Sequence, residues 1–560
     1  MNDPIRRIRD GLGDWMAAPA MFVSPIIGYL KFNDYSLLAP EALLAIGTFL
    51  AAGFVMSLAV HLMWSPIRVA TMTLTSFIVL YQVVVGTGVQ VPGEPINTLA
   101  GMIEHGFTAI VSIGAVIGLF FFWLRVRFAN LLCTFVFGVM AMSVALTPTT
   151  DDHEMTRVIK KQVAINRTLS PILHIILDEH QGLAGFPRDI AGGTDLAKMI
   201  EKHHRDRGFV VYPNAYSSYA QTVFAIPALL NNQAGRAAVG TLTWANDATT
   251  ARQNNWLTVL AKREYQVRVY GSKYLDFCQD DAVAFCQLYS TNSIHSLIEA
   301  DLPTLKKYRV ILDKFDDGVK LFWFTSAVID VIKTKFFGWS PNTDSLWQRN
   351  APRLSPFAAF SMIQDIVKDI ENGAAGKVFF IHLILPHYSY VFEDDCRIVE
   401  DEKQWLNRTQ RSGYNSPNGR KERYKRYFKQ TRCLHTALTR IYDALASTGL
   451  YEMATIIVHG DHGSRIGLLD VNAKTVNRVS SQDLIDAYST LYIVKRPNQV
   501  GATNLETRSV QDLFGEQFLG AAATPKSILY LRDEKVGQQA LDPGKPLGTV
   551  AVPPGFPQAQ

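Results

Sequence analysis

The chain has 560 residues, 48% of them hydrophobic, and a formal net charge of +5. This composition excludes few functional classes, but it gives no indication of a nucleic-acid partner and none is expected. Residues 1–150 are dominated by apolar stretches, whereas the remainder has the scattered charge of an α/β globular chain. We therefore expect a transmembrane anchor at 1–150, an extracytoplasmic domain at 151–540 and a flexible tail, rich in Pro and Gly, at 541–560.

Five apolar segments in the first 150 residues are candidate membrane spans. They are Ala17–Leu30, Glu41–Met63, Ile67–Gly86, Phe107–Leu124 and Phe128–Thr147. A helix needs about 20 apolar residues to cross a bilayer. The first segment is shorter and contains two prolines, so it is either a fifth span or an interfacial helix. A cleaved signal peptide is not expected, because further apolar segments follow at once.

Charge placement predicts the orientation of these spans. Arginines precede the first segment and lie between the second and third and between the fourth and fifth, whereas the alternate loops carry mainly acidic residues. Because basic residues favour the cytoplasmic side, five spans would place everything after about residue 148 outside. The spans have almost no ionisable residues at their centres, which favours an anchor over a transporter.

Two patterns near the start of the outside domain are typical of a polar site. Asp178 and Glu179 directly follow the strand-like run Ile172–Leu177. Adjacent carboxylates repel one another, so a nearby cation is expected, with a surface turn as the alternative. Further on, hydroxyl residues precede an apolar run within Ser217–Leu230. Hydroxyls at a helix N-terminus favour an alkoxide and a bound phosphate, with an ordinary N-cap as the alternative.

Four cysteines lie in the outside domain, and a fifth, Cys133, lies in the last apolar segment. The four form two pairs along the chain, Cys278 with Cys286 and Cys396 with Cys433. Two disulfides in an oxidising compartment fit their number and location, although sequence alone does not determine the pairing. Zinc ligation is disfavoured, because the spacings do not resemble Cys-x2-Cys. The aromatic-rich stretch Val319–Trp339 is either a buried helix edge or a membrane-surface helix.

The rest of the outside domain alternates helical and strand-like segments, which predicts an α/β fold with a largely parallel sheet. The expected elements are helix Phe357–Ile370, strand Val378–Leu385, helix Glu422–Ser447, and strands Ala454–His459, Thr490–Lys495 and Ser527–Leu531. The strand at 454–459 leads into Gly460-Asp461-His462-Gly463, where the glycines would allow a tight turn. Asp461 and His462 together can ligate one zinc-like ion. In such sheets, ligands bind at the carboxyl ends of the strands.

These motifs, in this order, resemble the alkaline phosphatase and sulfatase superfamily, and most closely its membrane-bound phosphoethanolamine and phosphoglycerol transferases. The resemblance implies one bound zinc ion, with manganese as the alternative. Its ligands would be Glu179, Thr222, Asp461 and His462, with Thr222 as the nucleophile and Pro227 at the family's spacing. His387, in Pro386-His387-Tyr388, resembles a substrate-binding histidine. Asp178 and His459 are additional candidates. Five-helix anchors in the bacterial inner membrane, with a periplasmic catalytic domain, also belong to this resemblance.

The chain also departs from the pattern of these families. No cysteine pair flanks Thr222, and Lys474 stands where a second substrate histidine is expected. Arg465 can take over a phosphate contact, because a guanidinium grips two phosphate oxygens at once. Sulfatases need a Cys/Ser-x-Pro-x-Arg motif for conversion to formylglycine, and residues 215–230 contain none. Sulfate ester cleavage is therefore disfavoured.

The leading hypothesis is transfer of a phospho-alcohol group from a membrane phospholipid to an envelope glycan or lipid through a phospho-threonine. A membrane-anchored phosphodiesterase or sulfatase-like hydrolase would use the same site with water as the acceptor. A non-catalytic envelope-assembly scaffold or transporter component is a further alternative. The sequence does not identify the headgroup or the acceptor.

Overall fold

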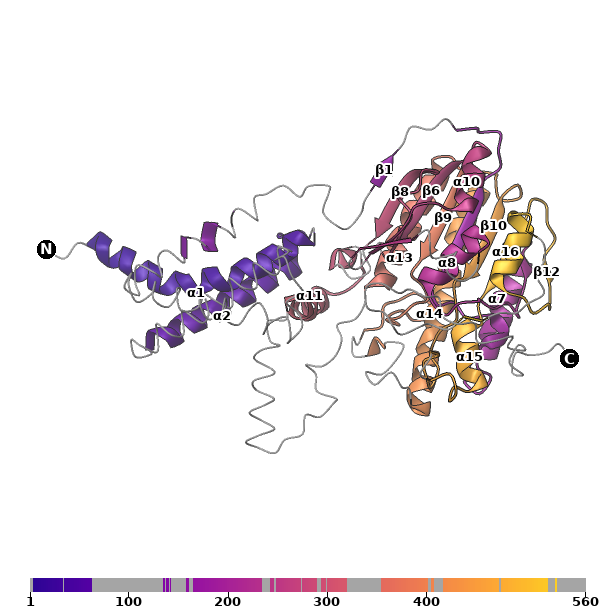
Figure 1. Cartoon of the computed structure of the whole chain (residues 1–560). Coiled ribbons are helices and arrows are strands. Elements are labelled where there is room, and N and C mark those ends of the chain that lie inside the picture. The colour runs from indigo at the N-terminus through magenta and orange to yellow at the C-terminus, as the bar shows by residue number, and fades with distance from the viewer. Residues whose placement is uncertain are drawn as a thin grey trace. The chain divides into compact units, whose positions relative to one another are not determined.

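The computed structural model consists of two compact units, one formed by Met1–His153 with Leu302–Ala351 and the other by Glu154–Asp301 with Pro352–Gln560 (Figure 1). The structure describes residues 4–33, 35–62, 134–135, 137–139, 142, 158–160, 165–233, 242–245, 248–272, 274–289, 294–298, 300–319, 354–400, 404–406, 416–472, 475–521 and 529–530. The predicted spans at 67–86 and 107–124, most of the span at 128–147, the stretch after Val319 and the tail at 541–560 lie outside these residues.

The first unit contains α1 (Pro4–Phe32), α2 (Pro40–Leu62) and α11 (Thr304–Val319). The predicted segment at 17–30 is part of α1, and the predicted span at 41–63 coincides with α2. Among the described residues, α2 is the one helix long and apolar enough to cross a membrane. Its large apolar side chains are largely exposed, Val55 at 68% and Leu62 at 78%.

Close contact between α1 and α2 depends on Gly53. A Cβ atom at this position would lie 2.4 Å from Pro19 Cα, which is too close for any side chain. The α11 helix also packs on this pair, because the Phe315 ring contacts Tyr29 and Phe49 with centroids 5.3 and 5.2 Å apart. The chain therefore returns to its N-terminal helices through a segment that hydropathy alone does not associate with them.

The second unit is built on a nine-stranded sheet, counted over the described residues, in the order β1-β8-β6-β9-β2-β10-β11-β3-β12. The five neighbours from β8 to β10 are parallel, whereas β1 and β11 join antiparallel. This confirms the predicted α/β domain with a largely parallel sheet. The strands are β1 (Val158–Lys160), β2 (Ile172–Leu177), β3 (Val210–Val211), β6 (Gln266–Ser272), β8 (Val283–Tyr289), β9 (Lys377–Leu383), β10 (Thr455–Gly460), β11 (Tyr492–Lys495) and β12 (Ala502–Thr503). A smaller sheet joins β4 (Leu242–Ala245), β5 (Ala248–Ala251) and β7 (Leu275–Asp276).

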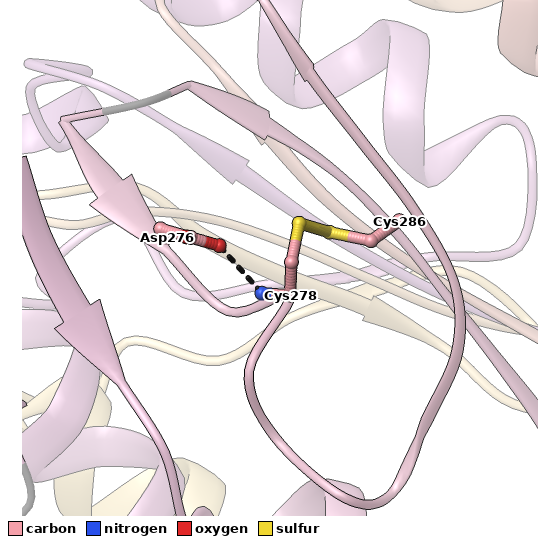
Figure 2. Close-up of side chains that lie close together, drawn as sticks. All are labelled: Asp276, Cys278 and Cys286. Carbon is pink, nitrogen blue, oxygen red and sulfur yellow. Dashed lines mark hydrogen bonds between the residues drawn. A yellow bond between two sulfur atoms is a disulfide. The ribbon is translucent and has the colours of Figure 1, made fainter. Parts of the chain in front are cut away.

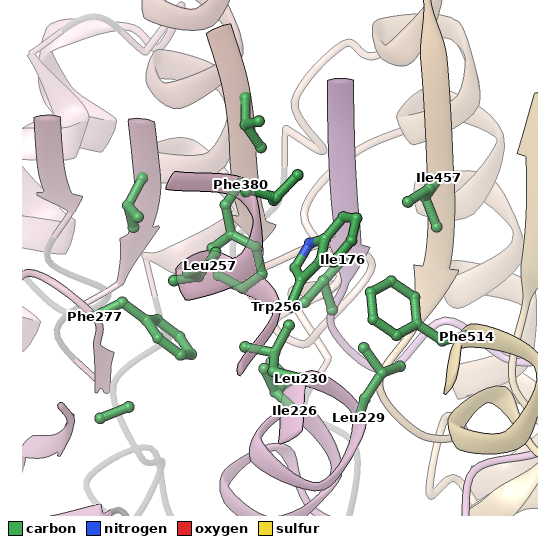
Figure 3. Close-up of a cluster of buried hydrophobic side chains, with 14 of the residues drawn as sticks. Ile176, Ile226, Leu229, Leu230, Trp256, Leu257, Phe277, Phe380, Ile457 and Phe514 are labelled. Atoms are coloured by element: carbon green, nitrogen blue, oxygen red, sulfur yellow. The ribbon is translucent and has the colours of Figure 1, made fainter. Parts of the chain in front are cut away.

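Helices cover both faces of the large sheet (Figure 1). On one face, a buried apolar cluster packs Leu229, Trp256 and Phe514 against Ile176 and Phe380 of the strands (Figure 3). Burial of such side chains is the main force that holds helices on a sheet. The helices of this unit are η1 (Leu183–Gly185), α7 (Gly193–Arg205), α8 (Thr222–Asn231), α10 (Asn255–Lys262), η2 (Ile294–Leu297), α13 (Ser355–Glu371), α14 (Pro417–Ser447), α15 (Ser481–Tyr488) and α16 (Val510–Phe518).

The predicted helix at 422–447 is longer in the structure, where α14 begins at Pro417. Ser416 caps it by accepting a hydrogen bond from the Gly419 N–H, and proline suits the first helical position because its missing N–H would have no partner there. The predicted strand at 490–495 begins two residues later, at Tyr492. Of the predicted strand at 527–531, the structure describes two residues, and Tyr530 forms a single bridge with Tyr219.

The structure forms both expected disulfides, Cys278–Cys286 and Cys396–Cys433. Asp276 lies beside the first of them, and its Oδ1 accepts a hydrogen bond of 2.6 Å from the Cys278 N–H (Figure 2). Although these three residues are close enough to hold a cation, both sulfurs are used in the disulfide. A thiolate is the form of cysteine that binds metal, so the arrangement is structural.

Candidate active site

Three neighbouring parallel strands bring the predicted site residues to one edge of the sheet. The register pairs Leu177 of β2 with Gly460 of β10 on one side and with Leu383 of β9 on the other. Asp178 follows β2, the Asp461-His462 pair follows β10, and His387 lies in the loop after β9. Because parallel strands end at the same edge, residues far apart in the chain converge here, as the sequence predicted.

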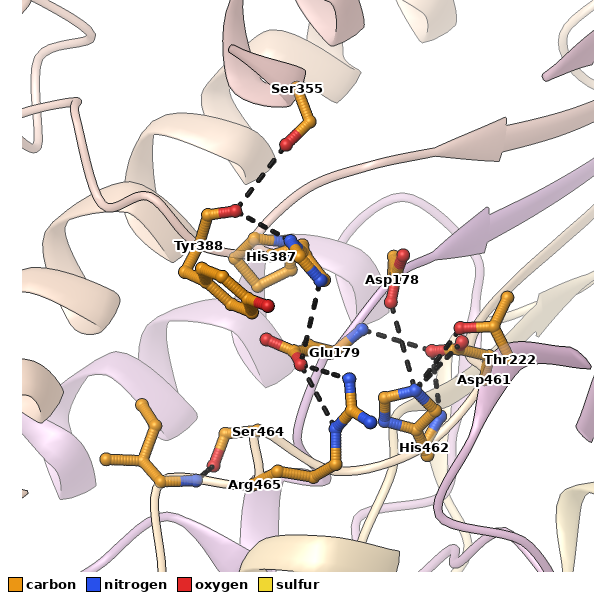
Figure 4. Close-up of polar contacts among 12 residues, drawn as sticks. Asp178, Glu179, Thr222, Ser355, His387, Tyr388, Asp461, His462, Ser464 and Arg465 are labelled. Carbon is orange, nitrogen blue, oxygen red and sulfur yellow. Dashed lines mark hydrogen bonds and ion pairs between the residues drawn. The ribbon is translucent and has the colours of Figure 1, made fainter. Parts of the chain in front are cut away.

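Asp178, Asp461 and His462 form the group best placed to hold a cation, and we call it the metal group. Their ligand atoms lie within 4.8 Å of one another, and all three residues are buried (Figure 4). His462 Nε2 lies 3.3 Å from Asp461 Oδ2 and 3.9 Å from Asp178 Oδ1. Two carboxylates and one imidazole are ligands typical of zinc and related divalent ions.

Hydrogen bonds around the metal group fit a cation at its centre. His462 Nδ1 lies 2.9 Å from the Gly463 carbonyl, so we assign the proton to Nδ1, and the Nε2 lone pair of the neutral ring then faces the carboxylates. Asp461 Oδ1 accepts the N–H groups of Glu179 and His462 at 3.1 and 2.9 Å. Asp461 Oδ2 has no hydrogen-bond partner among the described residues. A cation between Nε2 and the carboxylate oxygens would satisfy both.

Burial raises the pKa of Asp461 to about 6, although the Thr222 hydroxyl, the Glu179 and His462 N–H groups and the charge of Arg465 lower it. An ionised carboxylate in a dry environment is costly, and here it also faces a second carboxylate. A divalent cation would remove both penalties, which is a further reason to regard this group as a metal site.

Glu179, predicted as a metal ligand, points elsewhere. Its Oε1 accepts a hydrogen bond of 3.1 Å from Arg465 Nε and a second from Arg465 Nη2, and it lies 3.8 Å from His387 Nε2. The Glu179 backbone has a φ of 63° in the left-handed region, which turns the chain sharply after Asp178. This conformation costs roughly 1–3 kcal/mol and persists where neighbours hold it. Asp178, an additional candidate in the sequence, is in this structure the acid grouped with Asp461 and His462.

Thr222 is the first residue of α8 and joins the metal group from the helix side. Its Oγ1 lies 3.4 Å from His462 Nε2, and the side chain is 5% exposed. The positive end of the helix dipole stabilises negative charge at this position. All ten residues of α8 are buried, so the apolar helix is held firmly and the hydroxyl has a fixed location.

The two predicted substrate residues lie beside Glu179. His387 Nδ1 lies 2.6 Å from the Tyr388 carbonyl, which directs Nε2 towards Glu179. Arg465 also reaches the Ala220 carbonyl at 3.4 Å and so links the turn after β10 to the segment before Thr222. Burial opposes the charge on Arg465, but Glu179 outweighs it and raises the Arg465 pKa. Lys474 lies outside the described residues.

His459, the other additional candidate, belongs to the core and not to the metal group. Its Nε2 lies 2.8 Å from Nε2 of His174 in the middle of β2, and its Nδ1 lies 2.7 Å from the Gly460 carbonyl. Burial lowers the His459 pKa to about 4, which favours the neutral ring. His459 is the last side chain inside β10, and its ring packs against His174 and Tyr492, whereas Asp461 follows the end of the strand.

The glycines at 460 and 463 act differently from the expectation. Neither has a backbone in the left-handed region. A Cβ at Gly463 would lie 2.4 Å from the Asp486 carbonyl oxygen, and one at Gly460 would lie 2.2 Å from Thr490 Oγ1. Glycine is therefore required here because other segments pack against the backbone, and not because of turn geometry.

Several residues of α14 support the site and were not singled out from the sequence. Tyr424, Tyr427 and His435 are buried and contact the turns that carry the metal group, and buried Arg420 pairs with Asp486 beside them. Their spacing of three, four or eight positions is that of one helix face. Polar residues at these positions of an amphipathic helix are the signal that could have identified them.

The α/β sheet carries acids, an imidazole and a hydroxyl at its carboxyl edge, an arrangement suited to holding a cation beside a nucleophile. The sulfatase family model matches residues 196–516, more than half of the chain, and the chain belongs to this family. No curated protein matches it. Membership does not imply sulfate ester cleavage here, because the formylglycine motif is missing.

Solved structures with a similar fold come from several enzymes of this kind. A putative sulfatase from Bacteroides fragilis is 14% identical, with a TM-score of 0.35, and the match covers 63% of this chain and 74% of that one. A phosphonate monoester hydrolase from Silicibacter pomeroyi is 13% identical, with a TM-score of 0.37 and coverage of 65% and 80%. The C-terminal periplasmic domain of EcEptC from Escherichia coli, in complex with Zn, is 11% identical, with a TM-score of 0.37 and coverage of 70% and 96%. These similarities are too remote to bear on the reaction of this chain.

Proposed function

We propose that the chain transfers a phospho-alcohol group, phosphoethanolamine or phosphoglycerol, from a membrane phospholipid to a glycan or lipid of the bacterial cell envelope. The observation that carries the proposal is the position of the Thr222 hydroxyl, at a helix N-terminus and 3.4 Å from His462 of the metal group. A hydroxyl placed between a helix dipole and a cation site is suited to nucleophilic attack on phosphorus.

Asp178, Asp461 and His462 would hold one divalent ion, zinc or alternatively manganese, with Thr222 as a further ligand. When bound, such an ion lowers the pKa of a ligated hydroxyl and neutralises the charge of a phosphodiester. The Glu179 carboxylate contacts Arg465 and His387, the two proposed substrate residues. In this proposal it holds these two residues in place, and the Glu179 backbone N–H donates to Asp461.

The reaction would proceed in two displacements. Thr222 Oγ1 forms a bond to phosphorus, the bond from phosphorus to the diacylglycerol oxygen breaks, and the proton lost by Thr222 ends on diacylglycerol. An acceptor oxygen then bonds to phosphorus, the bond to Thr222 breaks, and the acceptor proton returns to Thr222. His387 and Arg465, on the same side as Glu179, would stabilise charge that develops on the phosphoryl oxygens.

The exposed apolar surface of α2 supports a membrane location, which a phospholipid donor requires. We propose a multi-pass protein of the bacterial inner membrane, with its catalytic unit on the periplasmic side. The two disulfides are consistent with an oxidising compartment.

Intact-mass and metal analysis of the full-length protein after incubation with phospholipid would test the proposal. We expect one bound divalent metal and one phospho-alcohol adduct on Thr222, whose added mass identifies the headgroup. Thr222→Ala should lose all adduct and all detectable transfer, whereas Thr222→Ser, which keeps a hydroxyl, should retain measurable activity.

Three other outcomes would count against transfer. Bound metal with release of free headgroup, and no modified acceptor, would indicate hydrolysis. Full activity in Thr222→Ala would remove the covalent mechanism. A wild-type protein without metal would favour the non-catalytic scaffold.

A further inference from the structure

Two short turns carry the metal group, and both lie against α14. The first turn is residues 178–181 after β2, and the second turn is residues 461–465 after β10. Each contains a non-glycine residue in the left-handed region, Glu179 with φ 63° and Arg465 with φ 53°. Since few residues other than glycine adopt this conformation freely, the surroundings must hold both turns in place.

Tyr427 holds the first turn. Its hydroxyl accepts a hydrogen bond of 2.8 Å from the Gln181 N–H and donates one of 2.9 Å to the Glu179 carbonyl. The hydroxyl therefore bridges the backbone on both sides of His180, immediately after Asp178. The Tyr427 side chain is fully buried, so no water competes for these bonds.

Tyr424 connects the first turn to the second. Its hydroxyl lies 2.8 Å from Gln181 Oε1 and 2.8 Å from Ser464 Oγ. It also lies 2.6 Å from Asp486 Oδ1. The Asp486 carbonyl accepts the Arg465 N–H at 2.6 Å, so this contact extends to the strained residue of the second turn.

A buried ion pair between Arg420 and Asp486 holds the carboxylate that Tyr424 contacts. Arg420 donates two hydrogen bonds to Asp486 Oδ2, at 3.1 Å from Nε and 2.8 Å from Nη2. A paired guanidinium fixes the orientation of the carboxylate that Tyr424 meets. Arg420, Tyr424 and Tyr427 thus share one helix face, from which the two tyrosines contact the turns and Arg420 holds Asp486.

We infer that Tyr424 and Tyr427 are positioning residues, whose hydroxyls set the distance between Asp178 on the first turn and Asp461-His462 on the second. The inference depends on the proposed metal centre but not on the identity of the transferred group. Partners outside a metal's own ligands commonly change its affinity about 10- to 100-fold. Neither tyrosine reaches the ligand atoms, so both act through the backbone that carries them.

The same helix supplies a matched control. Tyr442 is also buried in α14, where its ring packs against Phe209 and His204. Within the described part of the chain, its hydroxyl has no hydrogen-bond partner. Replacing Tyr442 by Phe therefore removes a buried hydroxyl from α14 without touching either turn.

The test measures Zn²⁺ affinity of the full-length protein in detergent, by competition with a chelator, together with the absorption spectrum of the Co²⁺-loaded protein. We expect Tyr424→Phe and Tyr427→Phe to bind Zn²⁺ about 10- to 100-fold more weakly and to alter the Co²⁺ spectrum. Tyr442→Phe should match wild type in both. A role in stability alone would lower the unfolding temperature and leave the Co²⁺ spectrum of the folded protein unchanged.

Wild-type affinity in both tyrosine variants would overturn the inference, as would an equal loss in Tyr442→Phe. If the tyrosine variants do not fold, Ser464→Ala tests the contact from the opposite turn. The expected result is again weaker Zn²⁺ binding, and unchanged binding overturns the role of Tyr424. A wild-type protein that binds no divalent metal would overturn this inference and the proposed function together. Metal binding without a Thr222 adduct would overturn the proposed function alone.

Discussion

Asp178 and Glu179 are adjacent, acidic and buried, yet the structure compensates their charges in different ways. Glu179 meets Arg465, a cation supplied by the chain itself. Asp178 faces Asp461 and His462, and its Oδ2 lies 3.9 Å from Nε2 of His382, so its basic neighbours are imidazoles and not a guanidinium. The comparison shows that one strand end can carry both an internal ion pair and a candidate cation site, because successive residues point in different directions.

The difference follows from the backbone of Glu179. Its left-handed conformation rotates the side chain away from the metal group, while its N–H still donates to Asp461. The two carboxylates therefore share one turn but contact different side chains. A substitution that changes the surroundings of one carboxylate tests how strongly the other depends on them.

Removing the internal cation should have the largest effect. Arg465→Gln would leave Glu179 buried without its main partner, and we expect a loss of about 3–5 kcal/mol in the free energy of unfolding. Chemical denaturation followed by circular dichroism measures this loss. The double variant Arg465→Gln/Glu179→Gln should recover part of it, and no recovery would show that the pair is not the source of the effect.

Replacing each of the two acids in turn by its amide separates their roles. Asp178→Asn should weaken Zn²⁺ binding more than about 100-fold, beyond the range of a residue that only supports a ligand. Glu179→Gln, which leaves the metal group intact, should weaken it less than about 10-fold. Chelator competition gives both values. If Glu179→Gln weakened Zn²⁺ binding more than Asp178→Asn, Glu179 would be the metal ligand, as predicted from the sequence.

Lowering the pH should weaken Zn²⁺ binding to the metal group gradually, and by less than the substitution of Asp178. Burial raises the pKa of metal-free Asp461 to about 6, and a metal ion binds the ionised form. The apparent Zn²⁺ affinity should therefore fall about tenfold per pH unit as the pH drops below about 6, and level off above it. Glu179→Gln should keep this slope. A slope unchanged by Asp461→Asn would assign the titration to another group.

In the metal-free protein, the raised pKa of Asp461 should make stability fall, and not rise, with increasing pH. Folding raises the pKa of Asp461 above its ordinary value of 3.8, so the folded state binds the proton more tightly than the unfolded state. Without metal, stability should therefore decrease as the pH rises from about 4 through about 6. With Zn²⁺ present the trend should reverse, and thermal unfolding with and without the metal compares the two.

Much of the fold could be predicted from local pattern. The strand at 172–177, the helix at 357–370 and the strand at 454–459 lie within a residue or two of β2, α13 and β10. Apolar runs of these lengths have few alternatives once their flanking turns are recognised. The antiparallel addition of β11 and the packing of α11 with α1 and α2 depend on long-range contacts, which local pattern does not encode.

The sequence by itself determined which residues could form the site. Acids and a histidine directly after apolar strands, and a hydroxyl at a helix start, converge because parallel strands end at a common edge. The tertiary structure decided which of the two adjacent acids faces the cation site, since that depends on a single backbone angle at Glu179. It also decided that His459 faces the core and that α14 holds both turns, because these contacts join residues 40 to 285 positions apart in the chain. Local preferences cannot specify such pairings; only packing of the whole sheet and its helices does.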